Sequence, residues 1–151
     1  MKAIPLREWL QPLRSHIHGW GLFTKADLQK HTMVIEYMGE LIRNVVSDKR
    51  EKDYENRKIG SCYMFRVDKE YIVDATLSGC MARFMNHCCR PNAYAKTITV
   101  DDEATGEKVK KIVVFANQVI KAGEEITYDY KFEKEDGSLH CNCGHRNCLV
   151  L

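Results

Sequence analysis

The chain closes with three cysteines, Cys141, Cys143 and Cys148, in the pattern Cys-x-Cys-x4-Cys. A structural zinc ion takes four ligands in a tetrahedron, so three clustered thiols require a fourth ligand from elsewhere. The only other dense group of cysteine and histidine is the segment 86–92, which contains Cys89. If Cys89 completes the set, one ion ties the end of the chain to its middle. The alternative is that the three cysteines are free thiols near a frayed terminus.

Composition limits the classes of protein to which the chain can belong. Residues 1–5 lack the apolar core of a secretory signal, so reduced thiols are expected rather than a disulfide framework. The remaining cysteines, Cys62, Cys80 and Cys88, are expected to be small buried hydrophobic residues. No apolar run approaches the roughly 18 residues of a membrane span. For that reason we expect no membrane association. Because the net charge is only +2, we also expect no direct DNA binding.

Short runs of β-forming residues recur between glycine-containing turns and predict one mainly β domain with short helices. These runs cover residues 33–37, 63–67, 71–74, 93–100, 111–116 and 125–128. Residues 97–114 are expected to form a hairpin around the polar loop 101–107. Ser47 is expected to cap a helix that runs to about Glu55, and a shorter helix is expected over residues 78–85.

The pair Asn86-His87 is a candidate for ligand binding. His87 adjoins Cys88, which suggests a cysteine–histidine catalytic pair, but neighbours in an extended strand point to opposite sides. Asn86 instead offers amide donors and acceptors to a polar ligand, and the backbone around His87 can do the same. On residue type alone, a buried asparagine–histidine pair that joins two loops explains these residues equally well.

Two further motifs are candidates for the same site. In His18-Gly19-Trp20-Gly21, two glycines allow a backbone to approach a ligand closely, although a tight turn explains them as well. No third glycine opens a helix after them, so this is not a dinucleotide-binding motif. In Tyr128-Asp129-Tyr130, the two phenols lie on one face of an extended chain and can form a hydroxyl-lined slot. An ordinary pair of core aromatic residues is the alternative.

Taken together, these motifs resemble the SET-domain protein lysine methyltransferases that carry a post-SET cysteine tail. The resemblance covers residues 10–149 and keeps the expected order. Within the family, the sequence is most similar to the trithorax and COMPASS-type enzymes, which methylate lysine 4 of histone H3, and the doubled Cys88-Cys89 is typical of the COMPASS type. The segments that carry the resemblance are residues 18–23, 36–39, 63–66, 74–76, 83–92 and 123–132, followed by the closing cysteines.

The resemblance implies a SET fold of several small β-sheets, with a pseudoknot-like threading near Asn86. It implies a SET domain over residues 1–132, with a short N-terminal flank, and a post-SET zinc-binding tail over residues 133–151. It also implies two bound groups, S-adenosylmethionine and one structural Zn²⁺ ion. The implied donor-binding residues are His18, Gly19, Trp20, Gly21, Tyr63, Asn86 and His87, and the implied zinc ligands are Cys89, Cys141, Cys143 and Cys148.

We expect Tyr130 to be the essential catalytic phenol, and Tyr128 to form the neighbouring wall and limit how many methyl groups fit. The resemblance implies a histone H3 tail as substrate, activating subunits of a COMPASS-type complex as partners, and a nuclear location within a larger protein. Ala93 departs from close relatives, which often have cysteine there. A non-catalytic zinc-stapled module that binds histone tails, and a methyltransferase for a non-histone lysine, are the alternative functions.

Overall fold

The computed structural model describes residues 6–131, 141–146 and 148, and the chain divides into two compact units. Unit 1 comprises Met1–Ile35, Phe84–Ala95 and Val114–Leu151, and unit 2 comprises Glu36–Arg83 and Lys96–Val113. The chain passes from one unit to the other four times, and three of these passages lie within strands. These strands form one sheet, in the order β3-β9-β8, and are β3 (Met33–Tyr37), β8 (Ala93–Asp101) and β9 (Lys108–Ala116).

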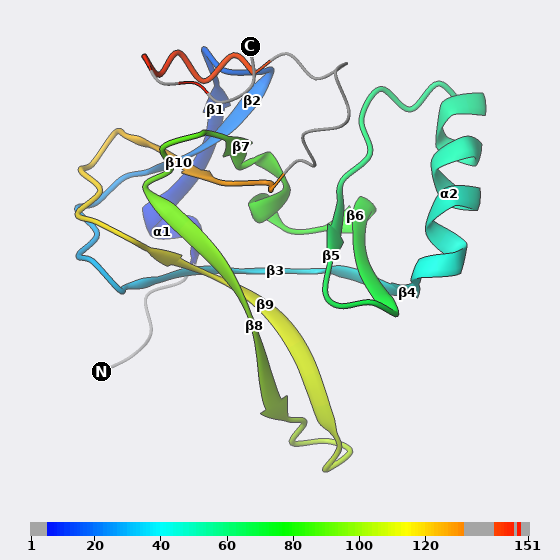
Figure 1. Ribbon diagram of the computed structural model, residues 1–151. Coiled ribbons are helices and arrows are strands. Elements are labelled where there is room, and N and C mark those ends of the chain that lie inside the picture. The colour runs from blue at the N-terminus through cyan, green and yellow to red at the C-terminus, as the bar shows by residue number, and fades with distance from the viewer. Residues whose placement is uncertain (1–5, 132–140, 147, 149–151) are drawn as a thin grey trace. The chain divides into compact units, whose positions relative to one another are not determined.

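Unit 1 contains a four-stranded sheet in the order β1-β2-β10-β7 (Figure 1). Its elements are α1 (Leu6–Trp9), β1 (Leu10–Arg14), β2 (Trp20–Thr24), β7 (Asn86–His87) and β10 (Glu125–Tyr128). Strand β10 is antiparallel to β2 and parallel to β7. Leu22 and Ile126 pair across β2 and β10 and are fully buried, which stabilises this pairing by roughly 1.5–3 kcal/mol for each side chain. The pairing of β7 with β10 brings two of the predicted site segments together.

Unit 2 contains a three-stranded antiparallel sheet in the order β4-β6-β5, and α2 contacts β4 and β6 (Figure 1). Its elements are β4 (Gly39–Arg43), α2 (Asn44–Asn56), β5 (Met64–Arg66), β6 (Tyr71–Gly79) and the 3₁₀ helix η1 (Met81–Phe84), whose last residue belongs to unit 1. Helix α2 has no broad apolar face, because its only buried residues are Ser47 and Tyr54. A polar anchor holds it instead. The buried carboxylate of Asp74 accepts hydrogen bonds from the Tyr54 hydroxyl (2.7 Å) and from Arg50 (3.0 Å).

The mainly β fold with short helices is confirmed, and the expected hairpin is present in β8 and β9. Its loop is closed where the Asp102 N–H donates to the Glu107 carbonyl at 2.8 Å. The cap expected at Ser47 is wrong. The helix begins at Asn44 after Arg43, and the Ser47 hydroxyl donates to the Asn44 carbonyl inside the first turn.

The predicted helix over residues 78–85 is also only partly correct. Strand β6 continues to Gly79, and only the 3₁₀ turn Met81–Phe84 is helical. Cys62 is exposed rather than buried, while Cys80 and Cys88 are partly buried. Among the helices described, none has the length and apolar character that crossing a membrane requires. The expected boundary between residues 132 and 133 lies outside the described residues, and both it and the pseudoknot-like threading stay predictions.

Candidate methyl-donor and metal site

Four cysteine sulfurs converge in unit 1. The Sγ atoms of Cys89, Cys141, Cys143 and Cys148 all lie within 4.8 Å of one another. Cys89 Sγ is 3.7 Å from Cys141 Sγ and 3.6 Å from Cys148 Sγ, much longer than the roughly 2 Å of a disulfide. A tetrahedron with Zn–S bonds of about 2.3 Å has sulfur–sulfur edges of about 3.8 Å. The cluster therefore has the donor atoms and the spacing that a zinc ion requires.

These four thiols cannot all ionise easily at such short separations. Burial raises the pKa of the Cys141 thiol to about 12. Burial acts in the same direction at Cys143, but backbone hydrogen bonds from Cys89 and His145 outweigh it and bring the Cys143 pKa to about 6. One sulfur therefore becomes a thiolate near neutral pH and opposes ionisation of its neighbours. A divalent cation would remove this opposition, because all four thiolates could bind it directly.

His87 connects the thiol cluster to the tyrosine segment. Its Nδ1 accepts a hydrogen bond from the Tyr130 backbone N–H at 3.2 Å, and its Nε2 lies 3.4 Å from Cys89 Sγ. Burial lowers the pKa of His87, although the nearby Asp129 carboxylate opposes this effect. Because Nδ1 is an acceptor, the neutral ring carries its proton on Nε2, facing Cys89. The ring thus fixes the backbone of Tyr130 relative to the thiol cluster.

Asn86 is buried and lies against the glycine-containing turn. Its side-chain Nδ2 donates towards the carbonyl oxygens of His18 (3.2 Å) and Trp20 (3.0 Å). Gly19, between these two residues, has a φ of +43°, which a residue with a side chain rarely adopts. The backbone of the turn therefore requires glycine at this position. The Trp20 ring is half exposed and stacks with the Arg14 guanidinium at 4.6 Å. The turn and Asn86 together present backbone carbonyls, an amide and an aromatic face.

The two tyrosines lie side by side, as predicted. The ring centroids of Tyr128 and Tyr130 are 4.7 Å apart, and Tyr128 is buried while Tyr130 is partly exposed. Tyr128 lies opposite His87 in the pairing of β10 with β7. The Tyr130 hydroxyl donates to the Met85 carbonyl at 2.5 Å. Because this hydrogen bond engages the hydroxyl hydrogen, the phenol presents its oxygen as an acceptor to other groups.

Six of the seven predicted donor-binding residues belong to unit 1, and Tyr63 belongs to unit 2. In unit 2, the Arg83 guanidinium lies 5.9 Å from the centre of the Tyr63 ring, and the backbone of Tyr63 pairs with residues 75 and 76. The structure thus brings together the Asn86-His87 pair, the turn at residues 18–21, the two tyrosines and the four cysteines within one unit.

Two carboxylates that organise these units were not predicted from the sequence. Asp74 lies within an apolar run and anchors α2, and Glu125 precedes the buried Ile126 and contacts both Ser15 and Asn86. A charged residue inside or beside a buried strand was the available signal, because such a residue requires a partner. The identity of the partner depends on distant segments, so the sequence alone could not supply it.

The SET-domain family profile matches residues 19–131, three quarters of the chain. The chain belongs to the SET-domain family. The SET domain here is 54% identical over 135 residues to human histone-lysine N-methyltransferase SETD1B and 52% identical to human SETD1A. It is 49% identical to histone-lysine N-methyltransferase set-2 of Caenorhabditis elegans.

Each of these matches covers 89% of this chain but only 7%, 8% and 9% of the respective relatives, so the chain spans less than a tenth of their length. Family membership confirms the resemblance stated from the motifs. A SET domain implies S-adenosylmethionine as methyl donor, and the four-cysteine cluster suggests a zinc site.

Proposed function

We propose that this chain is the catalytic domain of a histone-lysine N-methyltransferase, which transfers a methyl group from S-adenosylmethionine to lysine 4 of histone H3. The observation that carries the proposal is the meeting of Asn86 with the turn carbonyls of His18 and Trp20, beside the Tyr128–Tyr130 pair. Its kinship with proteins named as histone-lysine methyltransferases supports the same activity. Within the chain, residues 1–132 form the SET domain and residues 133–151 form the post-SET tail.

The residues proposed for the donor site have the polarity that S-adenosylmethionine requires. When bound, this molecule supplies an electrophilic methyl group on a positively charged sulfur. Trp20 offers an exposed aromatic face, and the carbonyls of His18 and Trp20 offer acceptors for a cationic ligand. Asn86 and the backbone of His87 offer polar contacts, and Gly19, Gly21 and Tyr63 complete the proposed set.

The target lysine has to react as a neutral amine, yet a free lysine has a pKa near 10.4 and is almost wholly protonated at neutral pH. Transfer into a channel that excludes water disfavours the charged form, so the amine can lose its proton to bulk water as it enters and no strong general base is required. Tyr130 acts as the essential phenol, presenting its oxygen to the reacting groups while Met85 holds its hydrogen. Tyr128 forms the adjacent wall, and its hydroxyl takes up space that further methyl groups would need.

The metal has a structural role in this proposal. One Zn²⁺ ion bound by Cys89, Cys141, Cys143 and Cys148 uses all four ligand positions, which leaves none for a substrate or a water molecule. The ion joins the tail to the segment that contains Asn86 and His87. Through His87, the same segment holds the backbone of Tyr130.

The names of the relatives support a histone as the substrate. The resemblance to the COMPASS-type enzymes extends this proposal to the histone H3 tail and to activating subunits of a COMPASS-type complex as partners. A chromatin substrate supports a nuclear location.

Incubation of the 151-residue chain with radiolabelled S-adenosylmethionine and an array of histone and non-histone peptides tests this function. The array is repeated in the presence of COMPASS-type subunits. We expect label on the histone H3 tail peptide, none on the same peptide with lysine 4 replaced by arginine, and none with Tyr130→Phe. Donor binding without transfer, even with the subunits present, would favour the binding module. Label confined to non-histone peptides would favour a methyltransferase for a non-histone lysine.

A further inference from the structure

The Glu125 carboxylate joins three segments of unit 1 that are distant in sequence. Glu125 is the first residue of β10 and is half-buried. Its Oε2 accepts a hydrogen bond from the Ser15 hydroxyl at 2.8 Å, and its Oε1 accepts one from Asn86 Nδ2 at 2.7 Å. Ser15 lies at the start of the turn that contains His18, since the Ser15 N–H donates to the Gly19 carbonyl and its Oγ accepts from the Ile17 N–H. The Glu125 carboxylate therefore contacts Ser15 at the start of the turn. It also contacts the Asn86 amide, which reaches the carbonyls of His18 and Trp20 further along the turn.

Gly21 explains how the carboxylate gains this position. A Cβ atom on Gly21 would lie 2.7 Å from Glu125 Cδ and 3.0 Å from Ser15 Cβ, which is closer than carbon atoms normally approach. The backbone at Gly21 is not left-handed, so an alanine is acceptable there in conformation and only the neighbouring side chains exclude it. Gly19 differs, because a Cβ there meets nothing within 4 Å and only its positive φ requires glycine. Glycine at position 21 thus makes room for the carboxylate of Glu125.

The carboxylate also determines which way the Asn86 amide points. Asn86 Nδ2 faces three oxygens, namely Glu125 Oε1 and the carbonyls of His18 and Trp20. Exchange of the amide oxygen and nitrogen would set the amide oxygen against all three, and the charged carboxylate makes this arrangement the most unfavourable. With Nδ2 fixed in this way, Asn86 Oδ1 is directed away from the three oxygens.

We propose that Glu125 is a positioning residue of the methyl-donor site, which orients the Asn86 amide and the turn at residues 15–21, and that Gly21 is glycine to admit its carboxylate. The proposal rests on the proposed function in one respect, namely that this turn and Asn86 bind S-adenosylmethionine. Glu125 acts through Asn86 and Ser15 and does not itself touch the reacting atoms.

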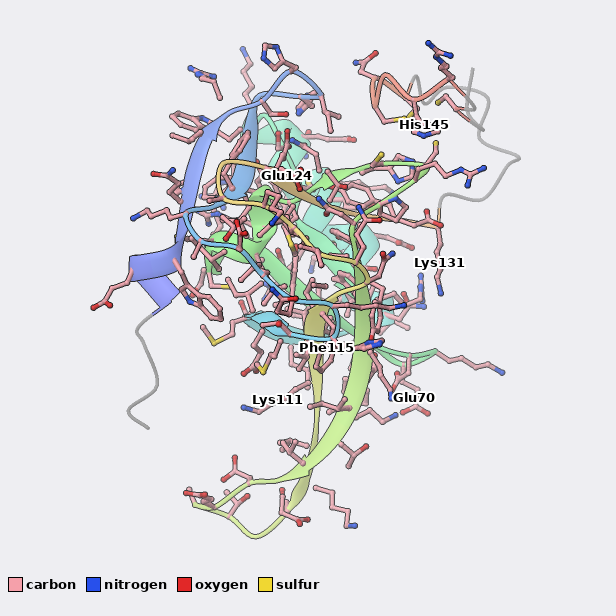
Figure 2. The ribbon with its side chains drawn as sticks, turned by 90° about the vertical axis from the view of Figure 1, so that its left-hand side faces the viewer. Glu70, Lys111, Phe115, Glu124, Lys131 and His145 are labelled. Carbon is pink, nitrogen blue, oxygen red and sulfur yellow. The ribbon has the colours of Figure 1, made fainter. Side chains whose placement is uncertain are left out.

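The first experiment compares S-adenosylmethionine binding by the wild-type chain, Glu125→Gln and Glu124→Gln, all zinc-loaded, using isothermal titration calorimetry. Glu124 lies in the turn before β10 (Figure 2) and is exposed, and its carboxylate accepts a hydrogen bond from the Lys121 N–H at 3.0 Å, which a glutamine can retain. We expect Glu125→Gln to weaken the affinity about tenfold, because a hydrogen bond to a charged group is lost and the amide can turn over. Glu124→Gln should bind within twofold of wild type.

Steady-state kinetics separate positioning from general damage to the fold. With Glu125→Gln, the KM for S-adenosylmethionine should rise about tenfold while the KM for the peptide stays within twofold. An equal rise in both, or donor affinity within twofold of wild type, would overturn the proposal.

The second experiment tests the relation between Glu125 and Gly21 without requiring activity. Gly21→Ala is made in the wild-type chain and in Glu125→Ala, and the four proteins are compared by thermal unfolding. We expect the loss in Tm caused by Gly21→Ala to fall to less than half when Glu125 is alanine, because the carboxylate no longer occupies the space. Equal losses in both backgrounds would overturn this part. A wild-type chain that binds no S-adenosylmethionine would defeat the proposed function, and the Tm comparison would still decide whether Glu125 and Gly21 are coupled.

Discussion

Replacement of Asp74 by asparagine should loosen α2 from the sheet that supports it. The Asp74 side chain is 1% exposed, and its carboxylate accepts from Arg50 at 3.0 Å, from the Tyr54 hydroxyl at 2.7 Å and from the Thr76 N–H at 3.0 Å. An asparagine has one acceptor oxygen, so its amide nitrogen faces either the Thr76 N–H or the Arg50 guanidinium. Both orientations place a donor against a donor in a buried position.

The expected cost follows from these contacts. Breaking a buried ion pair by removing one partner costs about 3–5 kcal/mol. Arg50 is partly exposed and keeps its second partner, Glu40, at 2.7 Å, so the cost should lie nearer to about 2–4 kcal/mol. Tyr54→Phe removes one hydroxyl donor and should cost about 1–2 kcal/mol.

Urea unfolding followed by far-ultraviolet circular dichroism measures these differences, with Asp48→Asn as the control. Asp48 lies on the same helix and is exposed, so its replacement should change the free energy of unfolding by less than about 0.5 kcal/mol. A cost for Asp74→Asn no larger than that of the control would refute the idea that this carboxylate anchors the helix.

The pH dependence gives a second check on the same residue. Burial acts to raise the pKa of Asp74, but hydrogen bonds from Tyr54, Thr76 and Arg50 outweigh it, so the pKa lies below the ordinary value of 3.8. Because the Asp74 pKa is lower in the folded state than in the unfolded chain, ionised Asp74 stabilises the fold at pH values above its unfolded-state pKa. This stabilisation is lost as the pH falls through the folded-state pKa. The stability difference between wild type and Asp74→Asn should therefore be constant near neutral pH and shrink below about pH 4. A difference that does not shrink would contradict the assignment.

Three further predictions concern the proposed site. Metal analysis should find one zinc ion per chain. Cys89→Ser or a strong chelator should remove this zinc and, with it, the binding of S-adenosylmethionine. Zinc retained by Cys89→Ser would exclude this ligand set. Tyr130→Phe should lower kcat by orders of magnitude and leave the affinity for S-adenosylmethionine nearly unchanged, as single-turnover kinetics and calorimetry can show; a rate within tenfold of wild type would argue against an essential phenol. Tyr128→Phe removes a hydroxyl from the wall beside Tyr130 and should shift the product from mono- towards di- and trimethyl-lysine in mass spectra, and an unchanged ratio would refute its steric role.

The sequence predicted those features that depend on local pattern or on atom type. The strand Met33–Tyr37 was predicted with the bounds that the structure has, because three of its five residues, Val34, Ile35 and Tyr37, favour strands. The four cysteines could be grouped because zinc requires four ligands and the chain offered only one other dense Cys/His segment. By contrast, the strands Leu10–Arg14 and Trp20–Thr24 were missed, since Pro12 and Gly21 normally weaken a strand. The two strands pair with each other, and Trp20–Thr24 also pairs with β10, which local patterns do not reveal.

The contacts that organise the site depend on residues too far apart in sequence for local patterns to relate. Ser15 and Glu125 are separated by 110 positions, and Arg50 and Asp74 by 24. The glycine at position 21 was interpreted from sequence as a place where backbone approaches a ligand or turns tightly. In the structure its missing side chain admits the carboxylate of Glu125. The partner of either residue in such a contact cannot be predicted until the pairing of the strands is known.

The most direct test of the central claim is tandem mass spectrometry of a histone H3 tail peptide after incubation with the chain, S-adenosylmethionine and COMPASS-type subunits. We expect methylation of the peptide, located by fragmentation on lysine 4, and none when Tyr130→Phe replaces the wild-type chain. A peptide that stays unmodified while the donor is bound, or that is methylated equally by Tyr130→Phe, would contradict the account.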